Sequence, residues 1–227
     1  LILFRFQPSE ITKVFLVLFL ADFLDKNQIS IKSLKNIIIP LIVSLFAFVL
    51  VLAEPDLGTA SVILMICLIM LPISGIRFRY YFYTISSFIV SLPIIWLVGL
   101  RDYQRERVIQ LFNPSYQVQQ AIIAIGSGGL FGKGIGFGTQ TQLRFLPVRH
   151  TDFIFATLGE ELGFVGIAIL LILFIALLSR ILRLIPRSID NFGALVSTGI
   201  FAMLFFQIIV NIGVNLGLLP VTGITLP

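Results

Sequence analysis

The chain has 227 residues, of which 58% are hydrophobic, and its mean hydropathy is +1.05. Soluble domains are less apolar than this, so we take lipid as the solvent of most of the chain. The 16 Lys and Arg outnumber the 11 Asp and Glu, but no lysine-rich tract is present and no nucleic acid is expected as a partner. The single cysteine, Cys67, excludes a disulfide framework and a cysteine metal site.

The first half of the chain contains four continuous apolar runs, which in a membrane favour helices over strands. The first begins at Pro8 and Ser9, where a helix cap is expected, and extends to about residue 24. The second covers about 37–52 and meets the third, about 59–71, at a short junction that contains Glu54. The fourth covers about 81–98, with aromatic residues near its ends that resemble interfacial anchors.

A long polar segment, residues 101–152, separates these runs from two more, at about 153–178 and 192–215. The pattern predicts an all-α, polytopic transmembrane helical bundle with six spans and one large loop, 101–152. We expect one transmembrane domain over 1–227 that is incomplete at both ends.

The basic residues of alternate loops indicate the orientation of the bundle, because such residues concentrate on the cytoplasmic side. The opposite loop also holds six basic residues, so the preference is narrow. The residues on the expected cytoplasmic face are Lys26, Lys32, Lys35, Arg77, Arg79, Arg180, Arg183 and Arg187.

Two arginines lie at the start of the polar segment, beside a helix-compatible stretch at 102–109. Arg101 and Arg105 are four residues apart and would share one helix face, where two guanidinium groups could bind a diphosphate. A solvated surface helix, or one that contacts lipid head groups, explains the same residues and is the simpler interpretation.

A glycine-rich run at 126–138 contains Lys133 and invites comparison with a phosphate-binding loop. A Walker loop needs Ser or Thr after its lysine, whereas Gly134 follows Lys133, and a dinucleotide fingerprint needs a βαβ pattern that is missing here. We therefore expect no nucleotide cofactor and interpret the run as a flexible loop with interfacial apolar side chains.

Asp152 lies where the polar segment returns to the membrane, directly after His150 and Thr151. Partial desolvation there would make its carboxylate a better general base, an effect that nearby Arg149 would oppose. Alternatively, Thr151 or Asp152 caps the following helix, and the spacing does not choose between the two interpretations. His150 more often bonds a neighbour than a metal, so metal ligands stay unknown.

Other charged residues fall inside apolar runs, where an unpaired charge is costly. Glu160 and Glu161 lie about two turns into the fifth run, so a functional or packing role is expected, with the carboxyl groups neutral or paired with another helix. Glu10 and Lys13, three residues apart, could form an internal ion pair. Glu54 is a further charged residue beside an apolar run whose role or partner is to be found.

Six short motifs follow one another along nearly the whole chain: RFQPSE at 5–10, EPDLGT at 54–59, DYQRER at 102–107, IGSGG at 125–129, HTDFIF at 150–155 and GEELG at 159–163. Each is weak alone, but in this order they resemble the SEDS family (shape, elongation, division, sporulation) of bacterial cell-wall synthesis, and most closely its RodA branch. The resemblance implies roughly ten spanning helices, of which these six are the middle and later ones. It also implies the bacterial inner (cytoplasmic) membrane, with residues 101–152 as a large extracytoplasmic loop.

The resemblance implies a peptidoglycan glycosyltransferase that polymerises lipid II, an undecaprenyl-diphosphate-linked donor, into glycan strands. Asp152 matches the essential loop aspartate of the family and would act as general base. Arg101, Arg105 and Lys133 are candidates to offset the charge of the diphosphate, with a divalent cation such as Mg²⁺ or Mn²⁺ as a potential cofactor. Glu54 is a further candidate for substrate binding.

Two places depart from the family pattern: Val148 stands where relatives commonly have Glu, and the segment at 113–116 is shorter than usual. The strings IGSGG at 125–129 and PVTG at 220–223 resemble the RodA branch, which implies a role in elongation with a class B penicillin-binding protein as partner. The alternatives are a division-type (FtsW-like) polymerase, a flippase or transporter of lipid-linked precursor, and a noncatalytic scaffold.

Overall fold

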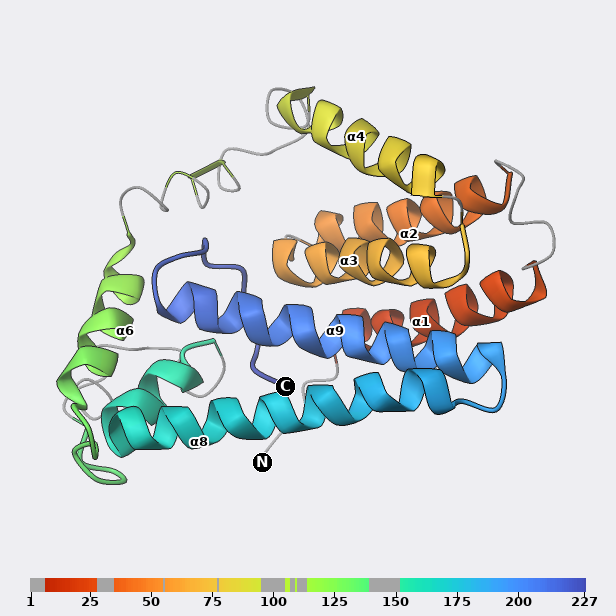
Figure 1. Ribbon diagram of the computed structural model, residues 1–227. Helices are drawn as coiled ribbons and strands as arrows, with labels where there is room; N and C mark the ends of the chain where they lie inside the picture. Colours follow the sequence, from red (N-terminus) through yellow and green to blue (C-terminus); the bar gives the residue numbers. More distant parts are fainter. Residues whose placement is uncertain are drawn as a thin grey trace. The chain divides into compact units, whose positions relative to one another are not determined.

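The structure is a computed structural model that describes residues 7–27, 35–54, 56–76, 78–94, 105–106, 109, 114–138 and 152–227. Every labelled element in these ranges is a helix (Figure 1). They are α1 (Pro8–Lys26), α2 (Lys35–Ala53), α3 (Leu57–Ile73), α4 (Phe78–Ile94), α6 (Tyr116–Ser127), α8 (Ile154–Leu184), the 3-10 helix η3 (Ile185–Arg187) and α9 (Asn191–Asn215).

The chain divides into two compact units, and both α8 and α9 contribute residues to each of them. The first unit comprises Leu1–Pro93 and Arg180–Leu204, and the second comprises Ile94–Ser179 and Phe205–Pro227. The helices α1 to α4 therefore belong to the first unit, and α6 with most of α8 belongs to the second.

In the first unit, α1, α2 and α3 pack against one another. Helix α1 begins with Pro8 in its first turn and buries Leu16, Leu20 and Leu24, which recur every four residues along one face. Helix α3 is capped by Asp56, whose carboxylate accepts a hydrogen bond from the Thr59 amide at 2.9 Å. The cap expected at Ser9 is wrong, because Ser9 lies inside α1 and the N-cap, Gln7, makes no side-chain cap bond. Pro8 at the start of α1 and the Asp56 cap of α3 explain why helices begin at the two motifs at 5–10 and 54–59.

In the second unit, α6 places a small apolar face inward, with Val118, Ala121 and Ala124 buried. Helix α8 is broken near its start, because Gly163 has φ +66° and ψ −163° and leaves the helical path. The break is the local feature around which the candidate site is built.

The apolar runs predicted from sequence overlap with α1, α2, α3, α4, α8 and α9, and the end of the fourth run, residues 95–98, lies outside the described residues. Helix α8 extends farther than expected, to Leu184, and its break at Gly163 was not predicted. Helix α6 was also missed, since the segment around it reads as polar. Of the helix expected at 102–109, residues 105, 106 and 109 are helical and the others lie outside the described residues.

Two helices among the described residues are long and apolar enough to cross a membrane, Ile154–Arg187 and Asn191–Asn215. The stretches Ile37–Ala53 and Leu57–Ile73 are apolar but shorter. The helical fold of the described residues agrees with the predicted fold class, while the count of six spans and the single large loop stay predictions.

Candidate functional site

Asp152 lies two residues before α8 begins and is half-buried. Its backbone carbonyl accepts hydrogen bonds from two carboxamides of α9, from Asn211 Nδ2 at 3.0 Å and from Asn215 Nδ2 at 2.9 Å. Asn215 Oδ1 also accepts a bond from the Ala156 amide at 3.0 Å. Since amides in the first turn of a helix lack partners within the helix, α9 supplies a cap for the start of α8.

A buried ion pair lies about two turns farther along α8. Glu160 is fully buried, and its Oε1 lies 3.1 Å from Lys133 Nζ. The same ammonium group donates a hydrogen bond to Ser127 Oγ at 2.8 Å. One partner of Glu160 is therefore a lysine of the glycine-rich loop, whereas sequence reasoning considered a neutral carboxyl or a partner on another helix.

Backbone hydrogen bonds tie this loop to the break in α8. The amides of Lys133 and Gly134 donate to the carbonyls of residues 160 and 161, both at 3.0 Å. The amides of residues 164 and 165 donate to the carbonyls of Gly129 and Leu130, at 2.9 and 3.1 Å. A helix break leaves backbone groups without partners, which is costly in an apolar environment, and the loop satisfies them. The flexible loop expected from composition is thus a fixed segment where it meets α8.

Glycine is required at the break itself, and the first prediction tests this. A Cβ on Gly163 would lie 2.8 Å from the Leu130 carbonyl oxygen and would also meet the Gly132 amide. We expect Gly163→Ala to lower the free energy of unfolding by about 1–3 kcal/mol more than Gly75→Ala does, measured by thermal unfolding of purified protein in detergent.

Gly75 is the matched control, because it also has a positive φ, +84°, yet a Cβ there would meet nothing within 4 Å. Both variants place alanine at a positive φ. Gly163 also has ψ −163°, a combination essentially restricted to glycine, so the difference reports the backbone conformation at the break together with the contact between loop and helix. Equal losses in the two variants would contradict the requirement for glycine at the break.

The remaining candidates of the polar segment are only partly described. Arg105 is half-buried and in helical conformation. The structure brings Lys133 to Glu160 and brings Asp152 to the two asparagines of α9. The candidates and neighbouring residues that lie outside the described residues are Arg101, Val148, Arg149, His150 and Thr151.

Helix α1 carries the other predicted charge pair. Lys13 Nζ lies 2.8 Å from Glu10 Oε1; the side chain of Lys13 is 1% exposed and that of Glu10 is 49% exposed. Gln7 Nε2 donates to Asp56 Oδ2 at 3.1 Å, so the motifs at 5–10 and 54–59 meet in space.

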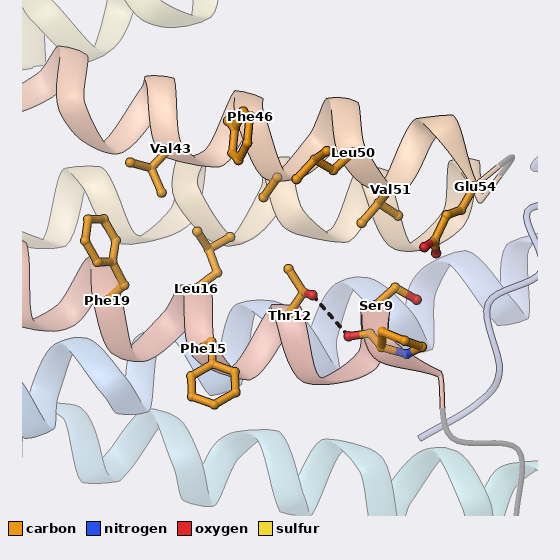
Figure 2. Close-up of a pocket in the computed structure, with 12 residues that line it drawn as sticks. Ser9, Thr12, Phe15, Leu16, Phe19, Val43, Phe46, Leu50, Val51 and Glu54 are labelled. Carbon is orange, nitrogen blue, oxygen red and sulfur yellow. Dashed lines mark hydrogen bonds between the residues drawn. The ribbon is translucent and has the colours of Figure 1, made fainter.

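Glu54, the remaining candidate for substrate binding, is exposed at the end of α2. It lines a groove of about 490 Å³ between α1 and α2. Figure 2 shows Glu54 and Ser9 at one end of this groove and apolar side chains, among them Phe19 and Val43, toward the other.

Sequence reasoning missed the two asparagines beside Asp152. A signal was present, because Asn211 and Asn215 are two carboxamides four residues apart in a strongly apolar run, where polar side chains need buried partners. No group of three or more His, Cys, Asp or Glu that could hold a metal ion occurs among the residues that the structure describes.

Comparison with known proteins covers the whole chain. A family model for FtsW, RodA and SpoVE, described as cell cycle protein, matches residues 1–227. The chain belongs to this family. The peptidoglycan glycosyltransferase MrdB of Escherichia coli (strain K12) is 45% identical over 230 residues, which cover 98% of this chain and 62% of MrdB.

Two solved structures resemble this SEDS protein in fold. A chain of the structure "Structural coordination of polymerization and crosslinking by a peptidoglycan synthase complex" has a TM-score of 0.78 and 33% identity, and the match covers 100% of this chain and 65% of that one. The rod shape determining protein RodA of Thermus thermophilus has a TM-score of 0.65 and 32% identity, covering 98% and 57%. The predicted SEDS membership, closest in kind to RodA, is confirmed.

Proposed function

We propose that this SEDS protein is a peptidoglycan glycosyltransferase that polymerises lipid II into glycan strands. The proposal rests on Asp152, a half-buried acid at the start of α8, in a chain 45% identical to a peptidoglycan glycosyltransferase. Family membership suggests the reaction, and Asp152 offers a proton acceptor for it. The direct test is polymerisation of lipid II by the purified full-length protein in detergent.

In the proposed reaction, a hydroxyl group of the acceptor sugar attacks the anomeric carbon of the donor. Asp152 takes the proton of this hydroxyl while the new glycosidic C–O bond forms. The bond between the anomeric carbon and the diphosphate oxygen breaks, and undecaprenyl diphosphate leaves with the electron pair. Base and nucleophile must be held within hydrogen-bond reach, so the position of Asp152 matters as much as its charge.

The leaving diphosphate gains negative charge, which nearby cations would stabilise. Lys133 is our first candidate, since Glu160 and Ser127 hold its ammonium group at a defined place. Glu160 neutralises much of that charge, so Arg101 and Arg105 are proposed to supply the remaining positive charge.

A divalent cation, Mg²⁺ or Mn²⁺, is a further component suggested by the resemblance. Because the described residues gather no three side chains that could hold a metal ion, we assign it no protein ligands and route no step through it. For Glu54 we propose a place in the substrate-binding site. The groove that it lines is apolar along most of its lining and could hold the lipid chain of the substrate.

The alternative function is a flippase or transporter of the same precursor. The observation that favours it is the buried Lys13 and its partner Glu10, since charges inside a membrane helix often line a transport path. Polymerisation in detergent discriminates between the two, because translocation has no meaning without a bilayer.

We further propose a partner and a cellular role. A class B penicillin-binding protein would crosslink the new strand, in line with the similar chain that belongs to a complex for polymerisation and crosslinking. A role in elongation is favoured by similarity to a rod shape determining protein, with a division-type role as the alternative.

The second prediction concerns orientation in the inner membrane. We expect a cysteine at Lys26 to resist an impermeant thiol reagent in intact cells and one at Ile135 to react, because the loop would be extracytoplasmic. Ile135 is 77% exposed and avoids the positive φ of Gly134, and the native Cys67 is buried, which keeps background labelling low. The reverse pattern would overturn the orientation.

A further inference from the structure

Two asparagines of α9 lie in an unusual place for carboxamides. Asn211 is 1% exposed and Asn215 is 0% exposed, within a helix apolar enough to cross a membrane. Burying an amide without hydrogen bonds is costly, so such residues are retained where their bonds serve a purpose. The partners of these two side chains therefore indicate what they do.

Both side chains donate to one atom, the backbone carbonyl oxygen of Asp152. A carbonyl oxygen has two lone pairs, so these two bonds use its full capacity. Asn215 Nδ2 also donates to the Asn211 carbonyl at 2.8 Å, which ties the two asparagines to each other. The accepting carbonyl is that of Asp152, the residue whose side chain is the proposed base.

The same carboxamides reach two further segments. Asn215 Oδ1 accepts from the Ala156 amide in the first turn of α8, and Asn211 Nδ2 donates to the Ile224 carbonyl at 2.8 Å. The asparagines thus bind the carbonyl of Asp152 and the first turn of α8, which follows it. The position of its carboxylate relative to α9 depends on these bonds.

We propose that Asn211 and Asn215 are positioning residues for Asp152, which set where its carboxylate meets the acceptor hydroxyl. This inference rests on the proposed function, in which Asp152 is the base. A displacement of a catalytic group by about 1 Å can reduce a rate on the order of 100-fold, so the loss of either carboxamide is sufficient to matter.

The test replaces each asparagine by leucine, which has a similar size and makes no hydrogen bond. In the full-length protein polymerising lipid II in detergent, we expect Asn215→Leu and Asn211→Leu each to lower kcat on the order of 10- to 100-fold. KM for lipid II should stay within about threefold, because the lost bonds act on the reacting step and not on binding.

The matched control is Gln207→Leu, which removes another buried carboxamide from α9, one turn before Asn211. No hydrogen bond of the Gln207 side chain occurs among the described residues, so this variant should lose less thermal stability than the asparagine variants and should keep kcat. If the two asparagines had only a structural role, all three variants would have the same kcat per folded molecule. A second readout is the double variant Asp152→Asn with Asn215→Leu. Its residual rate should equal that of Asp152→Asn alone, because Asn215 acts through Asp152.

If Asn215→Leu does not yield folded protein, Asn215→Ser, which keeps a smaller hydrogen-bonding group, takes its place. The inference alone is overturned if Asp152→Asn is inactive while the folded asparagine variants keep the kcat of the Gln207→Leu control. It is also overturned if neither Asn215 variant folds, because the pair is then structural. An active Asp152→Asn would instead remove the proposed function on which the inference rests.

Discussion

Asp152→Asn is expected to reduce lipid II polymerisation on the order of a hundredfold to ten-thousandfold, the usual contribution of a general base. Asparagine keeps the size of the side chain and its ability to cap a helix, but it accepts no proton. The bonds from α9 reach Asp152 through its backbone carbonyl, so the change leaves them in place. Thermal stability and binding of the proposed penicillin-binding partner should stay near wild type. The rate is measured with purified full-length protein and its partner.

Asp190→Asn is the control for this variant. Asp190 also lies before a helix, α9, where its Oδ1 accepts a bond from the Gly193 amide at 3.0 Å. The substitution is chemically identical and should leave polymerisation unchanged. If Asp152→Asn polymerised within a few-fold of wild type, Asp152 would be a helix cap and its catalytic assignment would have to be withdrawn.

Lys133→Met should be the most destabilising change at the site, lowering the free energy of unfolding by about 3–5 kcal/mol. The substitution leaves the fully buried Glu160 carboxylate without the ammonium group that lies 3.1 Å away. A buried carboxylate that loses an ammonium partner is costly, because burial keeps water from replacing that ion pair fully. Thermal or denaturant unfolding in detergent measures the loss, and adding Glu160→Gln should recover part of it by removing the charge.

An exposed pair of similar geometry provides the comparison. Lys26 Nζ lies 2.7 Å from Asp22 Oδ1, but their side chains are 71% and 52% exposed. Lys26→Met should therefore cost less than about 1 kcal/mol, as is usual for surface ion pairs. A loss in Lys133→Met no larger than in Lys26→Met would contradict the view that burial makes the Lys133–Glu160 pair important.

The positions of most helices could be predicted from sequence because a membrane leaves few alternatives to a helix for a continuous apolar run. Helix α6 escaped this reasoning, since it is only 12 residues long, begins with three glutamines among its first five residues and lies inside a long polar segment. The helix is indicated by buried apolar residues that recur every three positions, Val118, Ala121 and Ala124. A search for helical periodicity inside the polar segment would have found this helix.

The candidate site was predictable only where a motif marked it. Asp152 was singled out by its motif, but its partner Asn215 lies 63 residues away, and Lys133 and Glu160 are 27 residues apart. Such contacts arise from tertiary packing, so a local pattern can mark a buried polar residue but does not show which residue it meets. The prediction of a flexible glycine-rich loop was wrong for the same reason. The loop is held by backbone hydrogen bonds to α8 at the break near Gly163, and the sequence of the loop does not show these bonds.

The most direct measurement is the formation of glycan strands from purified lipid II by the purified full-length protein in detergent, followed by gel separation of the products. A glycosyltransferase should yield polymer that depends on Asp152, in a system where no bilayer exists for a flippase to act on. The proposed class B penicillin-binding partner is present throughout, with its own active site inactivated. Strands that form with wild type and disappear with Asp152→Asn are the predicted result. Absence of polymer from folded wild-type protein with its partner would contradict the proposed function.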